Sequence, residues 1–215
     1  MRGNRMKIEV RNGKAYISGY VNAVGRDSDP IPTPTGGQFV EMIEPGTFRE
    51  ALTRAKNVDM LLNHNEGRKL ASTAGGDLKL KEDNIGLYAE CEISDAEAVK
   101  KAKRGEFRGW SFGMFVNKDE MEQRGDKIPR RHVQNMDIVE VSLIDTRMTP
   151  CYAGTSVECR ADKQVLAETR AVEDPAEVTV TDTGADQRDE WQKKVNELNI
   201  KTAQDRVDAL KKACK

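Results

Sequence analysis

The 215-residue chain lacks several features that mark common classes of protein. No apolar run approaches the ~20 residues that a membrane-spanning helix requires, and the start MRGNRMKIEV has no apolar core of a signal peptide. Neither charge predominates, because 35 lysines and arginines face 36 aspartates and glutamates, for a net charge of -1. These absences argue against a membrane protein and a nucleic-acid binder with a basic surface. We expect a soluble protein made in the cytoplasm.

Cysteine, histidine and aromatic residues are also scarce. Aromatic residues make up only 5% of the chain, and a mean hydropathy of -0.70 indicates that part of its length is solvated. A disulfide framework, a zinc site and any other cofactor site are not expected, because no C-x-x-C pair occurs among Cys91, Cys151, Cys159 and Cys214. An imidazole base, if one is used, is either His64 or His132.

Alternating apolar and polar residues predict β-strands over much of the chain. MKIEVRNGKAYISGYVNA surrounds Asn12-Gly13, a strong hairpin signal. DLKLKEDNIGLYAECEI predicts two more strands, and GWSFGMFV and VQNMDIVEVSLID one each, the last two separated by a charged turn. VDMLLNH predicts a buried strand with His64 on the face of Met60 and Leu62. The pattern favours a mainly β (α+β) barrel or sandwich over a doubly wound sheet.

Two short helices interrupt the strands. EPGTFREALTRAK places Glu50 three residues after Thr47, and Glu97 in the second helix follows Ser94 at the same spacing. Both pairs match a capping box, and Gly105 ends the second helix. The glycines and prolines of GRDSDPIPTPTGG predict a long loop between the first hairpin and the first helix.

The character of the sequence changes near Arg160. We expect one folded domain over residues 1–160 and a flexible linker over residues 161–187, where the sequence is polar and without sustained periodicity. Residues 188–215 carry an apolar stripe that predicts an amphipathic helix. This helix either docks on a partner or folds back on its own domain.

Three residues break the pattern of a plain strand protein: His64 ends an apolar strand, Ser111 stands among aromatics beside a glycine, and Glu140 lies within IVEVSLI. A serine hydroxyl needs a base within hydrogen-bond reach, and the base needs a third group to orient it. A carboxylate among valines and isoleucines is costly to bury without a partner, and a histidine ring would supply one. The three together suggest a serine hydrolase.

Five blocks in a fixed order carry a family resemblance: EMIEPGTF, VDMLLNHN, DLKLKEDNIGLYAECEI, KRGEFRGWSFGMFV and DIVEVSLIDTRMTP. They closely resemble the caudovirus prohead protease family, the procapsid maturation serine proteases of tailed phages. The likeness extends from about Met6 to Ala153. It implies a compact antiparallel β-barrel with a few surrounding helices, similar in fold to the herpesvirus assemblin proteases.

The resemblance also implies roles and partners, and it makes the folded domain over residues 1–160 a serine protease domain. His64 of the NH motif would be the general base, Ser111 of the SFG motif the nucleophile, and Glu140 of the EVSL motif the residue that orients His64. Such an endopeptidase is packaged inside the procapsid in the host cytoplasm. It cleaves the scaffolding protein or the scaffold-like segment of the major capsid protein, and itself. We expect these substrates and self-association, but neither nucleic acid nor a membrane.

Alternatives remain open. The herpesvirus relatives use a second histidine that follows the serine, which makes His132 a rival to Glu140 as the third catalytic residue. A non-enzymatic scaffold or chaperone would also fit a charged tail with a terminal helix. An esterase is disfavoured, because no G-x-S-x-G motif surrounds Ser111.

Overall fold

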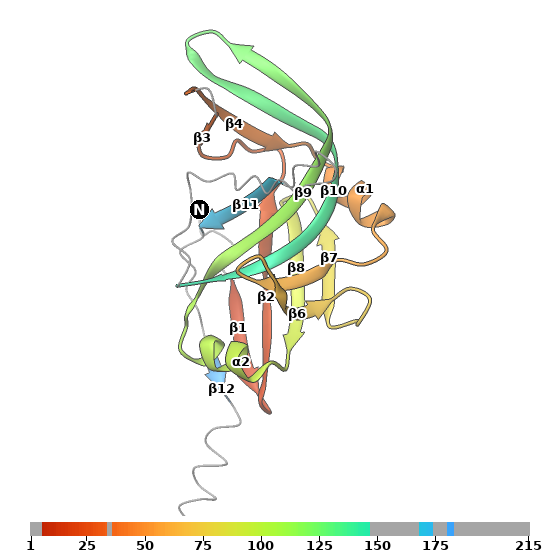
Figure 1. Ribbon diagram of the computed structural model, residues 1–215, viewed down its shortest axis with the longest axis vertical. Helices are drawn as coiled ribbons and strands as arrows, with labels where there is room; N and C mark the ends of the chain where they lie inside the picture. Colours follow the sequence, from red (N-terminus) through yellow and green to blue (C-terminus); the bar gives the residue numbers. More distant parts are fainter. Residues whose placement is uncertain (1–5, 34–35, 147–167, 174–179, 183–215) are drawn as a thin grey trace, which may run out of the picture.

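A computed structural model of the chain describes residues 6–33, 36–146, 168–173 and 180–182. The protein is mainly β, as the alternation predicted, with two sheets and two short helices in this part of the chain. Neither of these helices is long and apolar enough to cross a membrane. Figure 1 shows the strands of the two sheets crossing in two layers, with one long hairpin projecting beyond them.

The first sheet contains the N-terminal hairpin. Its strands run in the order β12 (Val180–Asp182), β1 (Lys7–Arg11), β2 (Lys14–Ala23), β8 (Gly86–Ile93) and β7 (Leu78–Glu82). The β1–β2 turn at Asn12 and Gly13 has φ values of 51° and 74°, as a type I′ hairpin requires. This confirms the predicted hairpin.

The second sheet carries the candidate site. Its main order is β11 (Glu168–Glu173), β9 (Phe107–Arg124), β10 (Lys127–Asp145), β4 (Gln38–Ile43) and β3 (Ile31–Pro32); β5 (Asp59–Leu62) also pairs with β10, and β6 (Asn65–Ser72) with β5. The β10–β4 and β10–β5 pairs are parallel, as is β1–β12. The other strand pairs are antiparallel, so the predicted antiparallel arrangement is confirmed for most pairs and wrong for these three. Strand β6 was not predicted.

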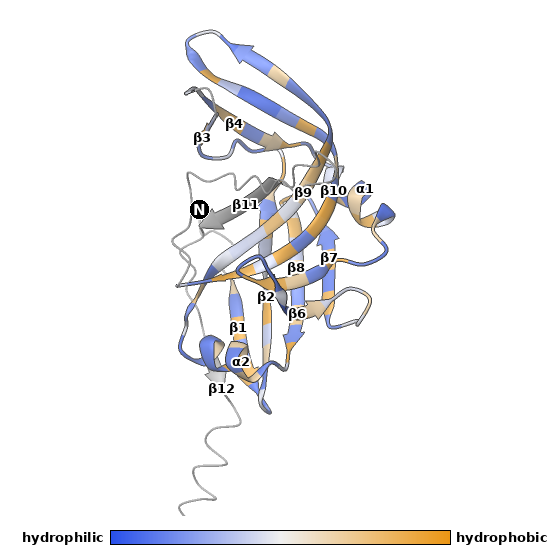
Figure 2. Cartoon of the chain, in the orientation of Figure 1, coloured by the Kyte–Doolittle hydropathy of each residue, from blue (hydrophilic) through white to orange (hydrophobic). Residues whose placement is uncertain are grey.

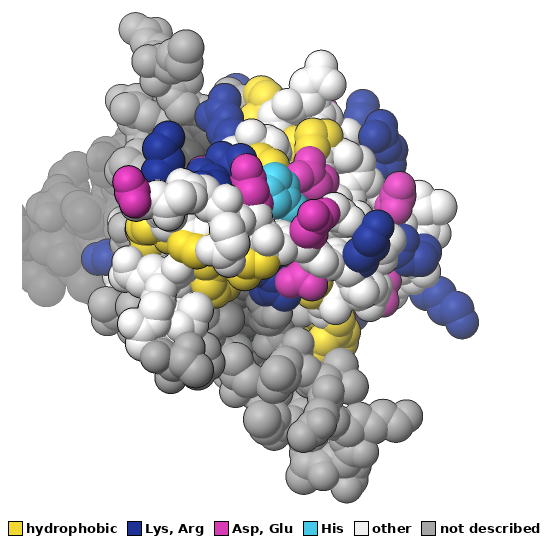
Figure 3. All heavy atoms as spheres, turned by 90° about the horizontal axis from the view of Figure 1, so that it is seen from above, with side chains coloured by type: hydrophobic (Ala, Val, Ile, Leu, Met, Phe, Trp, Pro, Cys, Tyr) yellow, Lys and Arg dark blue, Asp and Glu magenta, His cyan; other side chains and the backbone are white. Residues whose placement is uncertain are grey.

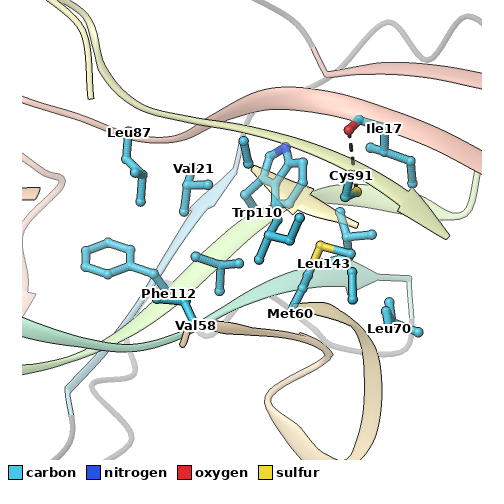
Figure 4. Packing of buried hydrophobic residues seen from close by; sticks show 14 of the residues in the cluster. Ile17, Val21, Val58, Met60, Leu70, Leu87, Cys91, Trp110, Phe112 and Leu143 are labelled. Carbon is cyan, nitrogen blue, oxygen red and sulfur yellow. Dashed lines mark hydrogen bonds between the residues drawn. The ribbon is translucent and has the colours of Figure 1, made fainter. Parts of the chain in front are cut away.

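The core lies between the two sheets. In Figure 4, side chains from strands of both sheets point toward one another, with Trp110 and Phe112 of β9 between them. The labelled members of this cluster are at most 8% exposed: Ile17, Val21, Val58, Met60, Leu70, Leu87, Cys91, Trp110, Phe112 and Leu143. Burial of alternate β9 side chains anchors this strand, and the intervening residues, Ser111 and Gly113, therefore face away from the core.

Strands β9 and β10 are much longer than the sequence suggested. The charged segment predicted as a turn continues both strands, and the chain reverses only near Gly125. Residues 117–123 are exposed, and Figure 2 shows the projecting end of the hairpin as largely hydrophilic. Cross-strand pairs stabilise it, so hydrophobic burial on one face was not needed to extend the ladder.

Helix α1 (Thr47–Arg54) does not begin with the predicted capping box. Gly46 is its N-cap, with φ 95°, and no side chain caps the helix. Thr47 is instead buried, and its hydroxyl donates to the Val133 carbonyl oxygen at 3.4 Å. Packing against β10 thus takes the hydroxyl that the capping prediction assigned to the helix terminus.

Helix α2 (Ala96–Lys103) begins one residue later than its predicted capping box implies. Asp95, rather than Ser94, is the N-cap, and its carboxylate accepts a hydrogen bond from the Ala98 amide at 2.8 Å. Gly105 follows the helix with φ 64°, consistent with its predicted role as a terminator.

The predicted linker overlaps two short strands. Both β11 and β12 fall inside residues 161–187, and each joins a different sheet. The rest of that segment and the predicted helix over 188–215 lie outside the described residues. The division into domain, linker and terminal helix stays a prediction.

Candidate active site

His64 lies in a tight turn between β5 and β6. Sequence alternation placed it on a strand face with Leu62, but β5 ends at Leu62 and the next two residues form the turn. Asn63 and His64 have φ values of 56° and 58°, both in the left-handed region. Positive φ at both central residues is what a two-residue type I′ hairpin requires, and asparagine tolerates it well. Histidine occupies the position where glycine is usually found.

The imidazole of His64 contacts a buried carboxylate. Its Nδ1 lies 2.7 Å from Oε1 of Glu140, which is only 8% exposed. An ionised carboxylate only accepts, so this contact favours the tautomer with the proton on Nδ1, which in a neutral imidazole leaves the lone pair on Nε2. That nitrogen makes no hydrogen bond within the described residues. A histidine in this state can take a proton from a nearby hydroxyl.

Ser142 links the two partners. Its hydroxyl donates to Oε2 of Glu140 at 2.5 Å and accepts a hydrogen bond from the His64 amide at 3.2 Å. Both carboxylate oxygens of Glu140 are therefore engaged, one by the ring and one by the hydroxyl. The group is satisfied by hydrogen bonds, as a buried carboxylate must be.

A β-bulge at Val139 aims Glu140 at the site. The β9–β10 register pairs Ile138 with Met114 but Glu140 with Gly113, so Val139 is an extra residue. Ile138 then points to the core, Val139 is 39% exposed, and Glu140 shares a face with Ser142. Strict alternation along this strand would put Val139 in the core and Ile138 on the face of Glu140, but the bulge shifts the period by one residue.

Ser111 lies on β9 beside this group. It is the cross-strand partner of Ser142, and residues directly opposite on antiparallel strands share a face with Cβ atoms about 4.5–5.5 Å apart. Ser111 is fully buried. On the other side of β9, Ala171 of β11 stands opposite Ser111 in an antiparallel pair. The nucleophile candidate is thus held in the middle of a three-strand segment.

Gly113 provides the space that Glu140 occupies. A Cβ atom placed on Gly113 would lie 3.0 Å from Oε1 of Glu140, the oxygen that accepts from His64. In the structure its nearest neighbour is the carboxylate of Glu140.

His132 belongs to a different cluster. Its Nδ1 lies 2.6 Å from Glu44 and its Nε2 3.0 Å from Glu122. Along β10 it is eight residues from Glu140, roughly 26 Å at the usual rise of a strand. These two carboxylates raise the pKa of His132 above its ordinary value of 6.5. The structure brings His64 and Glu140 together, and it places His132 on the projecting hairpin.

Cys91 is a free, buried cysteine. Burial raises the pKa of the Cys91 thiol to about 12, so no reactive thiolate forms there near neutral pH. In the described ranges, no three His, Cys, Asp or Glu residues are grouped so that they could hold a metal ion.

Comparison with known proteins supports the family resemblance of the sequence blocks. The sequence model of the caudovirus prohead serine proteases matches residues 4–170, well over half of the chain. The chain belongs to this family. It is a serine endopeptidase of phage capsid maturation. No curated protein and no solved structure matches it significantly.

Sequence reasoning missed two members of the site. Ser142 could have been found, because it lies two residues from Glu140 on the same strand face. Asn63 carries a weaker signal: asparagine is frequent in type I′ turns, but VDMLLNH was interpreted as an uninterrupted strand. The role of each depends on contacts between segments far apart in the sequence.

Proposed function

We propose that Ser111 is the nucleophile of this protease, His64 its general base and Glu140 the residue that orients and stabilises the His64 ring. The observation that carries the proposal is the 2.7 Å contact between Nδ1 of His64 and the buried carboxylate of Glu140, on the strand pair that holds Ser111. His132, the rival third member, engages two other carboxylates with both ring nitrogens.

The proposed mechanism follows from this arrangement. Nε2 of His64 removes the Ser111 proton as the hydroxyl oxygen attacks the scissile carbonyl carbon, and Glu140 stabilises the imidazolium that forms. His64 then protonates the leaving amine, and the acyl-enzyme remains. Water, activated by the same ring, releases the new carboxyl terminus and restores Ser111. Ser142 holds Glu140 in place throughout these steps.

The substrates of the proposed reaction are the scaffolding protein or the scaffold-like segment of the major capsid protein, cleaved inside the procapsid, and the chain itself. Self-cleavage is supported by β11, a segment near the C-terminus that pairs antiparallel with the strand of Ser111. Removal of residues beyond about Arg160 would separate a scaffold-binding terminal helix from the protease domain. We also propose that the fold is related to the herpesvirus assemblin barrel, which the crossing of two curved sheets supports (Figure 1).

Co-expression with the cognate capsid and scaffold proteins tests this function. Cleavage of these proteins, followed by gel and intact mass, is expected for the wild type and should fall by roughly 10⁶-fold, below detection, in Ser111→Ala and His64→Ala. The same mass measurement should show C-terminal trimming of the wild-type protease while Ser111→Ala stays full length.

Unchanged cleavage in either variant would remove the proposed roles. Capsid assembly without any cleavage, equally efficient with wild type and Ser111→Ala, would favour the scaffold or chaperone alternative. Equal trimming of both chains would assign the self-cleavage to another protease.

A further inference from the structure

The turn that carries His64 is attached to the protein body through Asn63. The Asn63 amide nitrogen of the backbone donates to the Leu143 carbonyl oxygen at 3.0 Å. Its side chain makes a reciprocal pair with Asp145. Nδ2 of Asn63 donates to Oδ1 of Asp145 at 2.9 Å, and Oδ1 of Asn63 accepts from the backbone amide of Asp145 at 2.9 Å. Three hydrogen bonds thus tie one turn residue to the end of β10.

Asp145 is in turn held by a buried cation. It is fully buried, and its Oδ2 lies 2.6 Å from Nζ of Lys101, which is 3% exposed. Lys101 belongs to α2, so the chain of contacts links this helix, the end of β10 and the hairpin tip. A buried ion pair contributes little net stability, so we infer that the role of this one is to fix geometry. Neither residue takes part in the proposed chemistry.

The turn needs such an anchor. Two consecutive non-glycine residues with positive φ are individually unfavourable and persist when surrounding contacts hold them. The direction of the His64 ring depends on the backbone of this turn, and its contact with Glu140 is short. A shift of the turn by a fraction of an ångström would weaken that contact and misplace Nε2.

We propose that Asn63, Asp145 and Lys101 form a positioning network that holds the His64 turn so that Nδ1 meets Glu140. This inference rests on the proposed function, because it assigns the base to His64. Asn63 is the member of the network next to His64, and Asp145 is the central member, which contacts both Asn63 and Lys101. The effect is on the orientation of the base, and substrate binding is not involved.

Two substitutions at one position separate side-chain anchoring from backbone strain. Asn63→Gly keeps the left-handed conformation accessible but deletes the amide that contacts Asp145, whereas Asn63→Ala deletes the amide and adds strain. Asn12→Gly is the matched control, since Asn12 occupies the first position of the other type I′ hairpin, with φ 51°. That turn is in the first sheet.

The kinetic test uses a peptide that spans the cleavage site mapped by co-expression. We expect Asn63→Gly to lower kcat about tenfold with KM nearly unchanged, Asn63→Ala to lower it at least as much, and Asn12→Gly to leave both constants at wild-type values. Wild-type kcat in Asn63→Gly with a reduced kcat in Asn63→Ala would assign the effect to backbone strain and overturn the network.

A second readout does not depend on activity. In the full-length Ser111→Ala chain, the Nδ1 proton of His64 should give a strongly deshielded proton resonance because it is hydrogen-bonded to a carboxylate. Asn12→Gly should retain this signal, and Asn63→Gly should weaken or broaden it. Retention of an unchanged signal in Asn63→Gly would overturn the network even if the protease itself proved inactive. Cleavage that persists in Ser111→Ala or His64→Ala would instead overturn the proposed function.

Discussion

The two histidines have nearly equal exposure but opposite settings. Their side chains are 21% and 20% exposed, for His64 and His132 respectively. One ring nitrogen of His64 contacts Glu140, whose side chain is 10% exposed. Both ring nitrogens of His132 make contacts, with Glu44 and Glu122, whose side chains are 34% and 45% exposed. Figure 3 shows acidic and basic side chains interspersed over the face seen from above, with hydrophobic side chains between them.

This difference shows that the carboxylate partners, and which ring nitrogens they engage, separate a candidate base from a structural cation. A histidine between two carboxylates can donate from both nitrogens only in its charged form, and in that form it has no lone pair with which to accept a proton. A histidine with one buried carboxylate is oriented and keeps a free nitrogen. Matched changes beside each histidine test this contrast.

The largest effect is expected from the carboxylate partners. Glu140→Gln preserves shape but removes the charge proposed to stabilise the His64 imidazolium, so kcat should fall by about 10³- to 10⁴-fold. Glu122→Gln is the same change beside His132 and should leave kcat within about twofold, since no reacting group is near. Cleavage rates with the mapped peptide measure both.

Equal activity losses in these two variants would break the contrast, because they would place His132 in the catalytic machinery. Circular dichroism and the unfolding midpoint of each variant serve as the folding control. A folded Glu140→Gln protein with wild-type kcat would remove Glu140 from the proposed site.

A smaller effect is expected at Gly113. The methyl group added by Gly113→Ala would meet Oε1 of Glu140 at 3.0 Å and force the carboxylate to shift, so kcat should fall about tenfold. Gly37→Ala is a fitting control, because its added Cβ would also be close to a side-chain oxygen, at 3.3 Å from Thr33. Its loop borders only the start of β10, at residues 127–129, far along that strand from Glu140. Wild-type rates in both variants would show that Glu140 tolerates the displacement.

The smallest effect concerns stability at His132. Its folded-state pKa is raised above 6.5 mainly by the hydrogen bond to Glu44, so its stabilising contribution is complete below 6.5 and is lost as pH rises through the folded value. The pKa of Glu122 is lowered below 4.5, chiefly by its hydrogen bond to His132, so its contribution is present above 4.5 and lost as pH falls. The pair therefore stabilises the fold between these limits.

Urea unfolding in the Ser111→Ala background measures this contribution. His132→Asn should lower the free energy of unfolding at about pH 5.5 and have less effect at about pH 9. A pH-independent difference would mean that the ring contributes through packing alone. The same scan of Glu140→Gln gives the comparison for the other histidine's partner.

Local sequence determined much of the fold. The Asn12-Gly13 turn, the strand pairs around it and both helices follow from residue preferences and from alternation over a few residues, because these depend on neighbouring parts of the chain. Charge-rich segments were harder to interpret: residues 117–123 looked like a turn, yet cross-strand pairing extends β9 and β10 through them. Pairing energy between distant segments is not visible in local composition.

The candidate site was also determined partly by local sequence and partly by tertiary contacts. The sequence alone supplied three chemically unusual residues, His64, Ser111 and Glu140, within motifs whose order identified the family. Only the tertiary structure decided that the His64 ring meets Glu140, while His132 meets Glu44 and Glu122. The physical reason is that a bulge, a left-handed turn and a buried ion pair set the direction of side chains, and each is held by contacts between residues far apart in the sequence. Asn63 and Asp145 are 82 positions apart, and Lys101 and Asp145 are 44 apart.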